Sequence, residues 1–154
     1  MSKIKKVVIP ILVVMFLLSA CGGKKYLSYQ ESYKKLEEAG YTITGHTEKE
    51  KILIFLQELA EDYNEYVVYE NSEYDRNLTK MDANTTNVES MIYAYKGELK
   101  VFIFYCEDED SAVMVSRAID SLFSSEMGEI MASQDKNFAY LYSAEVNDVL
   151  GFRD

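Results

Sequence analysis

The stretch VESMIYAYKGELKVFIFYC, residues 88–106, decides how this chain folds. Two runs rich in β-branched and aromatic residues flank Lys96-Gly97, and glycine readily takes the positive φ that a tight hairpin turn needs. We therefore predict a β-hairpin with strands at 88–95 and 98–106. Both faces of the second strand carry apolar side chains, which indicates an interior strand covered on each side.

The segments before the hairpin show helical spacing of apolar residues. Ser28-Tyr29-Gln30-Glu31 matches a capping box, and the amphipathic pattern behind it ends at Gly40. Residues 41–44 are β-branched and aromatic and predict a short strand. A second capping box at 47–50 precedes apolar residues at helical spacing between Ile52 and Tyr63, which predicts a second helix.

The segments after the hairpin complete an α+β pattern. Residues 107–123 predict a helix, 137–143 a strand and 144–150 a short closing helix. Without the first and last helices the order is β-α-β-β-α-β, that of the ferredoxin-like fold. We expect a compact antiparallel sheet with helices on one face, ferredoxin-like with an extra helix at each end. An α+β sandwich of another topology is the alternative.

Residues 64–87 lack a clear period. Residues 66–69 are compatible with a strand, but the polar stretch that follows predicts a long loop, and loops of this length are usually functional or mobile. Tyrosine is common at protein interfaces. We therefore predict an interaction surface here, with Tyr66, Tyr69 and Tyr74 as its candidate residues.

The N-terminus has the pattern of an export signal. Residues 1–6 carry three lysines and no acid, and residues 7–20 are an uncharged run too short for a comfortable membrane span. The run ends in Leu18-Ser19-Ala20-Cys21, which resembles the lipobox of bacterial lipoproteins.

This resemblance implies that residues 1–20 are a signal peptide and that Cys21 is the lipidation site, carrying a diacylglyceryl group as the first mature residue. Residues 21–27 would then be a lipidated tether with a reach of at most ~25 Å, and residues 28–154 a single domain. Two acyl chains anchor a protein stably. We expect a membrane-anchored protein on the extracytoplasmic face.

The second half of the chain also resembles a loose class of small Gram-positive lipoproteins. The matching residues are VFIFYCEDEDSAVMVSRAI (101–119) and NFAYLY (137–142). In that class a hairpin leads through an acidic turn to a helix and an aromatic strand. The resemblance implies a fold and a surface location, and it brings no assigned activity.

The amino-acid composition argues against some classes of function. Without the three leader lysines, 13 basic residues face 26 acidic ones, a formal net charge of −13. Nucleic-acid binding needs a basic stripe, so we expect no nucleic-acid partner. With Cys21 lipidated, Cys106 has no partner for an intrachain disulfide, and the 13 tyrosines and the six phenylalanines that follow the leader must supply a core by packing alone.

Few residues are candidates for chemistry. Glu107, Asp108 and Asp110, with Glu109 between them, are weak candidates for a cation site, but they lack the spacing and central glycine of a calcium loop. We favour a helix start capped by Asp108.

The single histidine, His46, stands beside a predicted helix cap, and no nucleophile-elbow or phosphate-loop motif accompanies it. Cys106 alternates with phenylalanines and is expected to be buried and unreactive. We predict no catalytic residue, resident metal or cofactor.

The sequence thus favours a non-enzymatic binding module that contacts a protein, a peptide or a cell-wall component through residues 64–87. A carboxylate-dependent hydrolase and a cation-binding surface protein are the alternatives.

Overall fold

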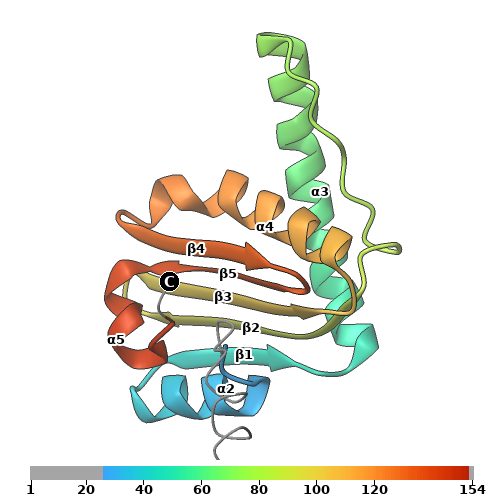
Figure 1. Ribbon diagram of the computed structural model, residues 1–154. Coiled ribbons are helices and arrows are strands. Elements are labelled where there is room, and N and C mark those ends of the chain that lie inside the picture. Colours follow the sequence, from blue (N-terminus) through green and yellow to red (C-terminus); the bar gives the residue numbers. More distant parts are fainter. Residues whose placement is uncertain (1–25, 153–154) are drawn as a thin grey trace, which may run out of the picture.

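The computed structural model describes residues 26–152, so the predicted leader and Cys21 lie outside the described residues. Its centre is a five-stranded antiparallel sheet in the order β1-β2-β3-β5-β4, with helices packed on both faces (Figure 1). The predicted α+β class with a compact antiparallel sheet is confirmed.

The elements follow one another with short connections, apart from the segment between α3 and β2. Their bounds are α2 Tyr29–Glu38, β1 Thr42–His46, α3 Lys49–Tyr74, β2 Val88–Lys96, β3 Leu99–Cys106, α4 Glu109–Phe123, β4 Ile130–Asp135, β5 Phe138–Ser143 and α5 Asn147–Leu150. Short 3-10 helices span Ser124–Glu126 and Ala144–Val146. The predicted hairpin is β2 and β3, and Gly97 takes a φ of 60° in its turn.

The alternating side chains of the sheet build two cores. Phe102 and Phe104 of β3 pack with the apolar faces of α3 and α4. Val101 and Ile103 face the opposite way, into a second cluster that includes residues of α2 and α5. The prediction that β3 is an interior strand covered on both sides is confirmed, as is the pair of helices that shares one face of the sheet.

The strand order differs from the ferredoxin-like arrangement, so that part of the prediction is wrong. In that fold a crossover helix places the first two strands parallel with another strand between them. Here β1 pairs directly and antiparallel with β2, with Ile43 opposite Ala94. The reason is that α3 runs out past the sheet and residues 75–87 return along it (Figure 1). The chain therefore re-enters the sheet at the end where it left.

Sequence inspection also missed β4. This strand pairs with β5 alone and forms one edge of the sheet. Its connection to β5 is a tight turn in which Lys136 takes a left-handed φ of 51°. Because β4 is an edge strand with few strongly β-forming residues, its pairing depends on the apolar strand β5 beside it.

The predicted long loop at 64–87 is wrong in its first half. Residues 64–74 continue α3, which has 26 residues and a length of about 39 Å. No strand forms at 66–69. The second half of α3 and the returning chain together make a projection, here called the arm (residues 64–82), which rises beyond the sheet (Figure 1).

The first described residues belong to the domain, which shortens the predicted tether of residues 21–27. The ring of Tyr26 stacks on Phe138 with centroids 4.2 Å apart. The Tyr105 hydroxyl donates a hydrogen bond of 2.9 Å to the carbonyl of Leu27, and Ser32 completes this contact with a 3.0 Å bond to the same hydroxyl. Residues 26–152 contain no helix that combines the length and the apolar composition of a membrane span.

Candidate functional site

Two asparagines hold the arm together. The Asn64 side chain donates to the Met81 carbonyl at 2.9 Å and accepts from the Met81 amide at 2.7 Å. The Asn71 side chain makes the same pair of bonds with Leu78, at 3.0 and 2.8 Å. Each asparagine thereby satisfies the backbone of one residue of the returning chain, much as a neighbouring strand would.

The spacing of these contacts follows from backbone geometry. Asn64 and Asn71 are seven residues apart, which is close to two helical turns and about 10.5 Å of rise. Leu78 and Met81 are three residues apart, which in extended chain is about 10 Å. The two pairs therefore meet in register, and the returning chain lies antiparallel to α3. Met81, only 3% exposed, anchors the lower end of the arm in the core.

The tip of the arm is also ordered by contacts. Asp75 ends α3 in the left-handed conformation, with a φ of 50°. Beyond it the chain reverses, and Arg76 forms an ion pair of 3.1 Å with the largely buried carboxylate of Glu70. The Arg76 guanidinium also lies over the ring of Tyr74, and the rings of Tyr74 and Tyr69 form a T-shaped pair with centroids 6.0 Å apart. A hydrogen bond with Tyr74 raises the pKa of the Tyr69 hydroxyl.

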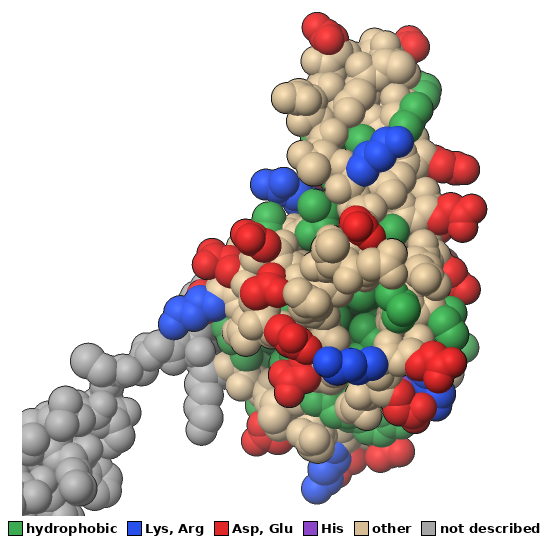
Figure 2. All heavy atoms as spheres, turned by 90° about the vertical axis from the view of Figure 1, so that its right-hand side faces the viewer, with side chains coloured by type: hydrophobic (Ala, Val, Ile, Leu, Met, Phe, Trp, Pro, Cys, Tyr) green, Lys and Arg blue, Asp and Glu red, His purple; other side chains and the backbone are tan. Residues whose placement is uncertain are grey.

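The outer face of the arm carries exposed apolar side chains. Val68, Tyr69 and Tyr74 are 52%, 55% and 57% exposed. A shallow hollow of about 640 Å³, here called the arm groove, is lined by Glu61, Asn64, Glu65, Val68, Tyr69, Ser72 and Lys80. Figure 2 shows the arm standing out from the rest of the molecule, with acidic side chains at its tip and along its side. The arm is therefore a projecting surface, held together by these contacts, with apolar and acidic parts.

The structure brings together two of the three tyrosines that the sequence singled out. Tyr69 and Tyr74 touch at the tip and are exposed. Tyr66 is half-buried, packs against the core on the α3 side and stacks near Tyr63. Sequence reasoning missed Val68 and the acids of the groove. The sequence did contain a signal that the helix continues through this region, because Tyr63, Val67 and Glu70 keep the helical spacing of the buried positions.

The acidic run at 107–110 starts helix α4. Asp108 caps it: one carboxylate oxygen accepts from the Ser111 amide at 2.7 Å and the other from the Asn87 side chain at 3.1 Å. The bond from the Ser111 amide, followed by that from Asn87, lowers the pKa of Asp108. Glu107 instead faces Lys49 at 3.6 Å. Across residues 26–152 no three His, Cys, Asp or Glu side chains are arranged to hold a metal ion, and Asp110 joins no such group.

The two other candidate reactive residues, His46 and Cys106, lie at the ends of different strands. His46 ends β1, opposite Met91 of β2. Cys106 ends β3 and is buried in the core. Burial, with a smaller contribution from the charge of Asp108, raises the pKa of the Cys106 thiol to about 12. A thiol with such a pKa is almost wholly protonated near neutral pH and is a poor nucleophile.

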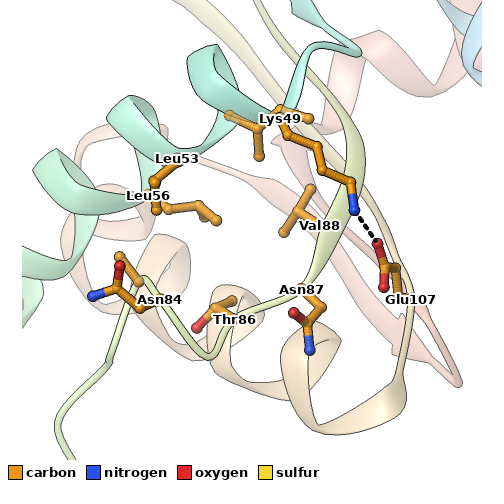
Figure 3. A pocket seen from close by; sticks show the side chains of 10 residues that line it. Lys49, Leu53, Leu56, Asn84, Thr86, Asn87, Val88 and Glu107 are labelled. Carbon is orange, nitrogen blue, oxygen red and sulfur yellow. Dashed lines mark ion pairs between the residues drawn. The ribbon is translucent and has the colours of Figure 1, made fainter.

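A smaller hollow of about 160 Å³ lies where α3 begins, beside residues 83–88 (Figure 3). Leu53, Leu56 and Val88 point toward it, and the ion pair between Lys49 and Glu107 stands at its rim. Glu107 is the only carboxylate among its lining residues, so this hollow lacks the facing pair of carboxylates that glycoside hydrolysis uses.

Comparison of the chain with models of protein families, with curated proteins and with solved structures finds no significant match.

Proposed function

We propose that this protein is a lipid-anchored, extracytoplasmic and non-enzymatic binding protein that presents its arm to a partner outside the membrane. The leader and the Leu18-Ser19-Ala20-Cys21 sequence support the anchor. The observation that carries the binding role is the projecting arm, whose Val68, Tyr69 and Tyr74 are more than half exposed.

The anchor and the arm fit together geometrically. Five residue steps separate Cys21 from Tyr26, which is packed on the domain, and a chain of that length spans at most about 18 Å. A domain on so short a tether stays close to the bilayer. The arm tip lies at the opposite end of the molecule from α2 and the start of the described chain (Figure 1). A partner approaching from outside would therefore meet the arm first.

Exposed apolar side chains are individually ordinary on a protein surface. The placement of these side chains is less ordinary, because α3 and its asparagine contacts hold them well clear of the sheet and its two cores. A rigid surface loses little conformational entropy on binding, and aromatic side chains contribute strongly to interfaces. Both properties support an interaction role for the arm.

Two measurements test the lipid anchor. Mass spectrometry of the processed N-terminus is expected to find a diacylglyceryl group on Cys21, and Cys21→Ser is expected to release the protein from the membrane fraction. An unmodified Cys21 thiol in a protein that keeps its leader would refute the anchor.

For the binding role, a photo-cross-linking amino acid replaces Ser72, which lines the arm groove, and the cells are irradiated intact. We expect one dominant adduct, which the variant Val68→Ser/Tyr69→Ser abolishes. The matched control is Ile54→Ser/Tyr95→Ser, which removes two exposed apolar side chains that lie outside the arm. Equal adducts in both variants would contradict a role for the arm.

A further inference from the structure

The arm groove also indicates what kind of partner it fits. We infer that the arm binds a cationic, amphipathic helical segment of another protein or peptide, an inference that rests on the binding role proposed above. Three features carry it: the spacing of the groove residues on α3, the charges on its walls, and its length.

The groove residues form one stripe of the helix. Glu61, Glu65, Val68 and Ser72 are separated by four, three and four residues, which places them on a single face of α3. This is the spacing at which one helix receives the side chains of another. The buried residues of α3, among them Tyr63 and Val67, lie on a different face and pack into the core. The stripe is thus free for a second helix.

The walls of the groove differ in charge. Glu61 and Glu65 follow one another along α3 below the apolar pair Val68 and Tyr69. Neither carboxylate has an ion-pair partner within residues 26–152. The wall on the other side contributes Lys80 from the returning chain. A partner that places basic side chains over the two glutamates and apolar ones over Val68 and Tyr69 complements both parts of the stripe.

The surroundings strengthen this preference. Asp62, Glu73, Asp75 and Asp82 also belong to the arm or adjoin it, and the Arg76 charge is already paired with Glu70. Acidic side chains of the arm are visible from its base to its tip in Figure 2. An acidic field attracts basic partners and repels anionic ones. An anionic wall polymer or an acidic peptide is therefore disfavoured.

The length of the groove suits a helix. Eleven residue steps from Glu61 to Ser72 cover about 16 Å, or three helical turns. An amphipathic helix laid in such a groove contacts it through residues three and four apart, which is a recurring mode of peptide recognition.

The test uses the full chain in uncharged detergent, with a photo-cross-linking amino acid in place of Ser72 and a synthetic 14-residue peptide of lysine and leucine at helical spacing. A lysine/serine peptide of the same charge and a glutamate/leucine peptide of the same pattern are the controls. We expect saturable cross-linking of the lysine/leucine peptide only. The same amino acid in place of the exposed Glu37 of α2 is expected to give no saturable adduct.

Two variants measure the contributions of the apolar and the acidic parts of the stripe separately. Val68→Ser/Tyr69→Ser is expected to weaken binding about tenfold or more, since truncated aromatic anchors commonly have effects of this size. Glu61→Gln/Glu65→Gln is expected to weaken it several-fold at low salt and to differ little from the unaltered chain at about 1 M salt, where charges are screened. Tyr95→Ser and Glu37→Gln/Glu38→Gln, which lie off the stripe, are the matched controls and should change binding less than twofold.

Several results would overturn the inference. If the lysine/serine peptide bound equally well, binding would depend only on attraction between a basic peptide and an acidic protein. If the glutamate/leucine peptide bound equally well, the acidic side chains of the arm would not select the partner. An absence of saturation at Ser72 would show that the groove does not accept this class of partner. If the arm variant still loses its adduct in intact cells, the proposed binding role survives and only the partner class is wrong.

Discussion

Replacing Asn64 by alanine tests whether the asparagines hold the arm in place. The substitution removes two partly buried hydrogen bonds, of 2.9 and 2.7 Å, to the backbone of Met81. At about 1 kcal/mol of net stabilisation each, their loss favours local opening of the returning chain by about 2 kcal/mol. Because a tenfold change corresponds to about 1.4 kcal/mol, the opening equilibrium rises about 30-fold.

Hydrogen exchange at the Met81 amide reports the loss of this contact, since that amide donates to Asn64 and the substitution removes its acceptor. We expect its exchange to accelerate by at least about 30-fold under conditions where opening is a rapid pre-equilibrium. The free energy of global unfolding should fall by less than the roughly 2 kcal/mol estimated for local opening. The reason is that alanine is a better helix former than asparagine and stabilises α3 by about 0.5 kcal/mol in the same variant. Leu78, still held by Asn71, should be affected less than Met81.

The matched control is Asn84→Ala. The Asn84 side chain is exposed and makes only a 3.3 Å bond to Asp82 nearby in sequence, so its loss should change exchange and stability by no more than about 0.5 kcal/mol. Unchanged exchange at Met81 in Asn64→Ala, or an equal effect of both substitutions, would show that Asn64 does not secure the returning chain.

Three further predictions concern the body of the domain. A Cβ at Gly45 would meet the Tyr29 hydroxyl and the ring of Tyr33 at 3.1 Å, so Gly45→Ala should lower the free energy of unfolding in urea by about 1–2 kcal/mol, and adding Tyr29→Phe should restore part of it. The Cys106 thiol, with a pKa of about 12, should not react with Ellman's reagent at pH 8 until the protein is unfolded; rapid reaction of the native protein would contradict its burial. Burial likewise raises the pKa of Tyr105 to about 12 in the folded protein, from a value near 10 in the unfolded chain. The protonated Tyr105 hydroxyl therefore stabilises the fold at a pH below about 10, and this contribution is lost as the pH rises toward 12. The stability advantage of the unaltered chain over Tyr105→Phe should therefore shrink between pH 8 and pH 11, and a constant difference would refute the assignment.

Local signals in the sequence were sufficient for most elements. The hairpin of β2 and β3 was predictable because its turn chemistry and apolar runs are contiguous. Ser28 and Glu31 form the capping box that their spacing predicts, with a 2.9 Å bond from the Ser28 amide to the Glu31 carboxylate. Asp108 caps α4 in the same local way. In each case the interacting groups lie within a few residues, so the pattern itself contains the partners.

The arm was harder because its contacts join distant residues. Asn64 and Met81 are 17 positions apart, and nothing in the polar stretch between them marks the pair. The β-branched and aromatic residues at 66–69 favour a strand on propensity alone, yet they continue α3. Propensity is a weak influence that tertiary contacts override, here through Val67 packing in the core and Asn71 binding the returning chain.

The sequence by itself determined the α+β class, the hairpin at its centre, the caps of α2 and α4 and the burial of Cys106, since each depends on apolar period or on neighbours along the chain. The capping box predicted at residues 47–50 does not form, because α3 begins after Glu48 with no side-chain hydrogen bond at its cap. Tertiary structure alone decided the strand order, the edge strand β4 and the arm. The physical reason is that these features depend on which backbone groups find partners across the fold. A pair of amide side chains on α3 binds the backbone of the returning chain, which leads into β2, and β2 pairs with β1.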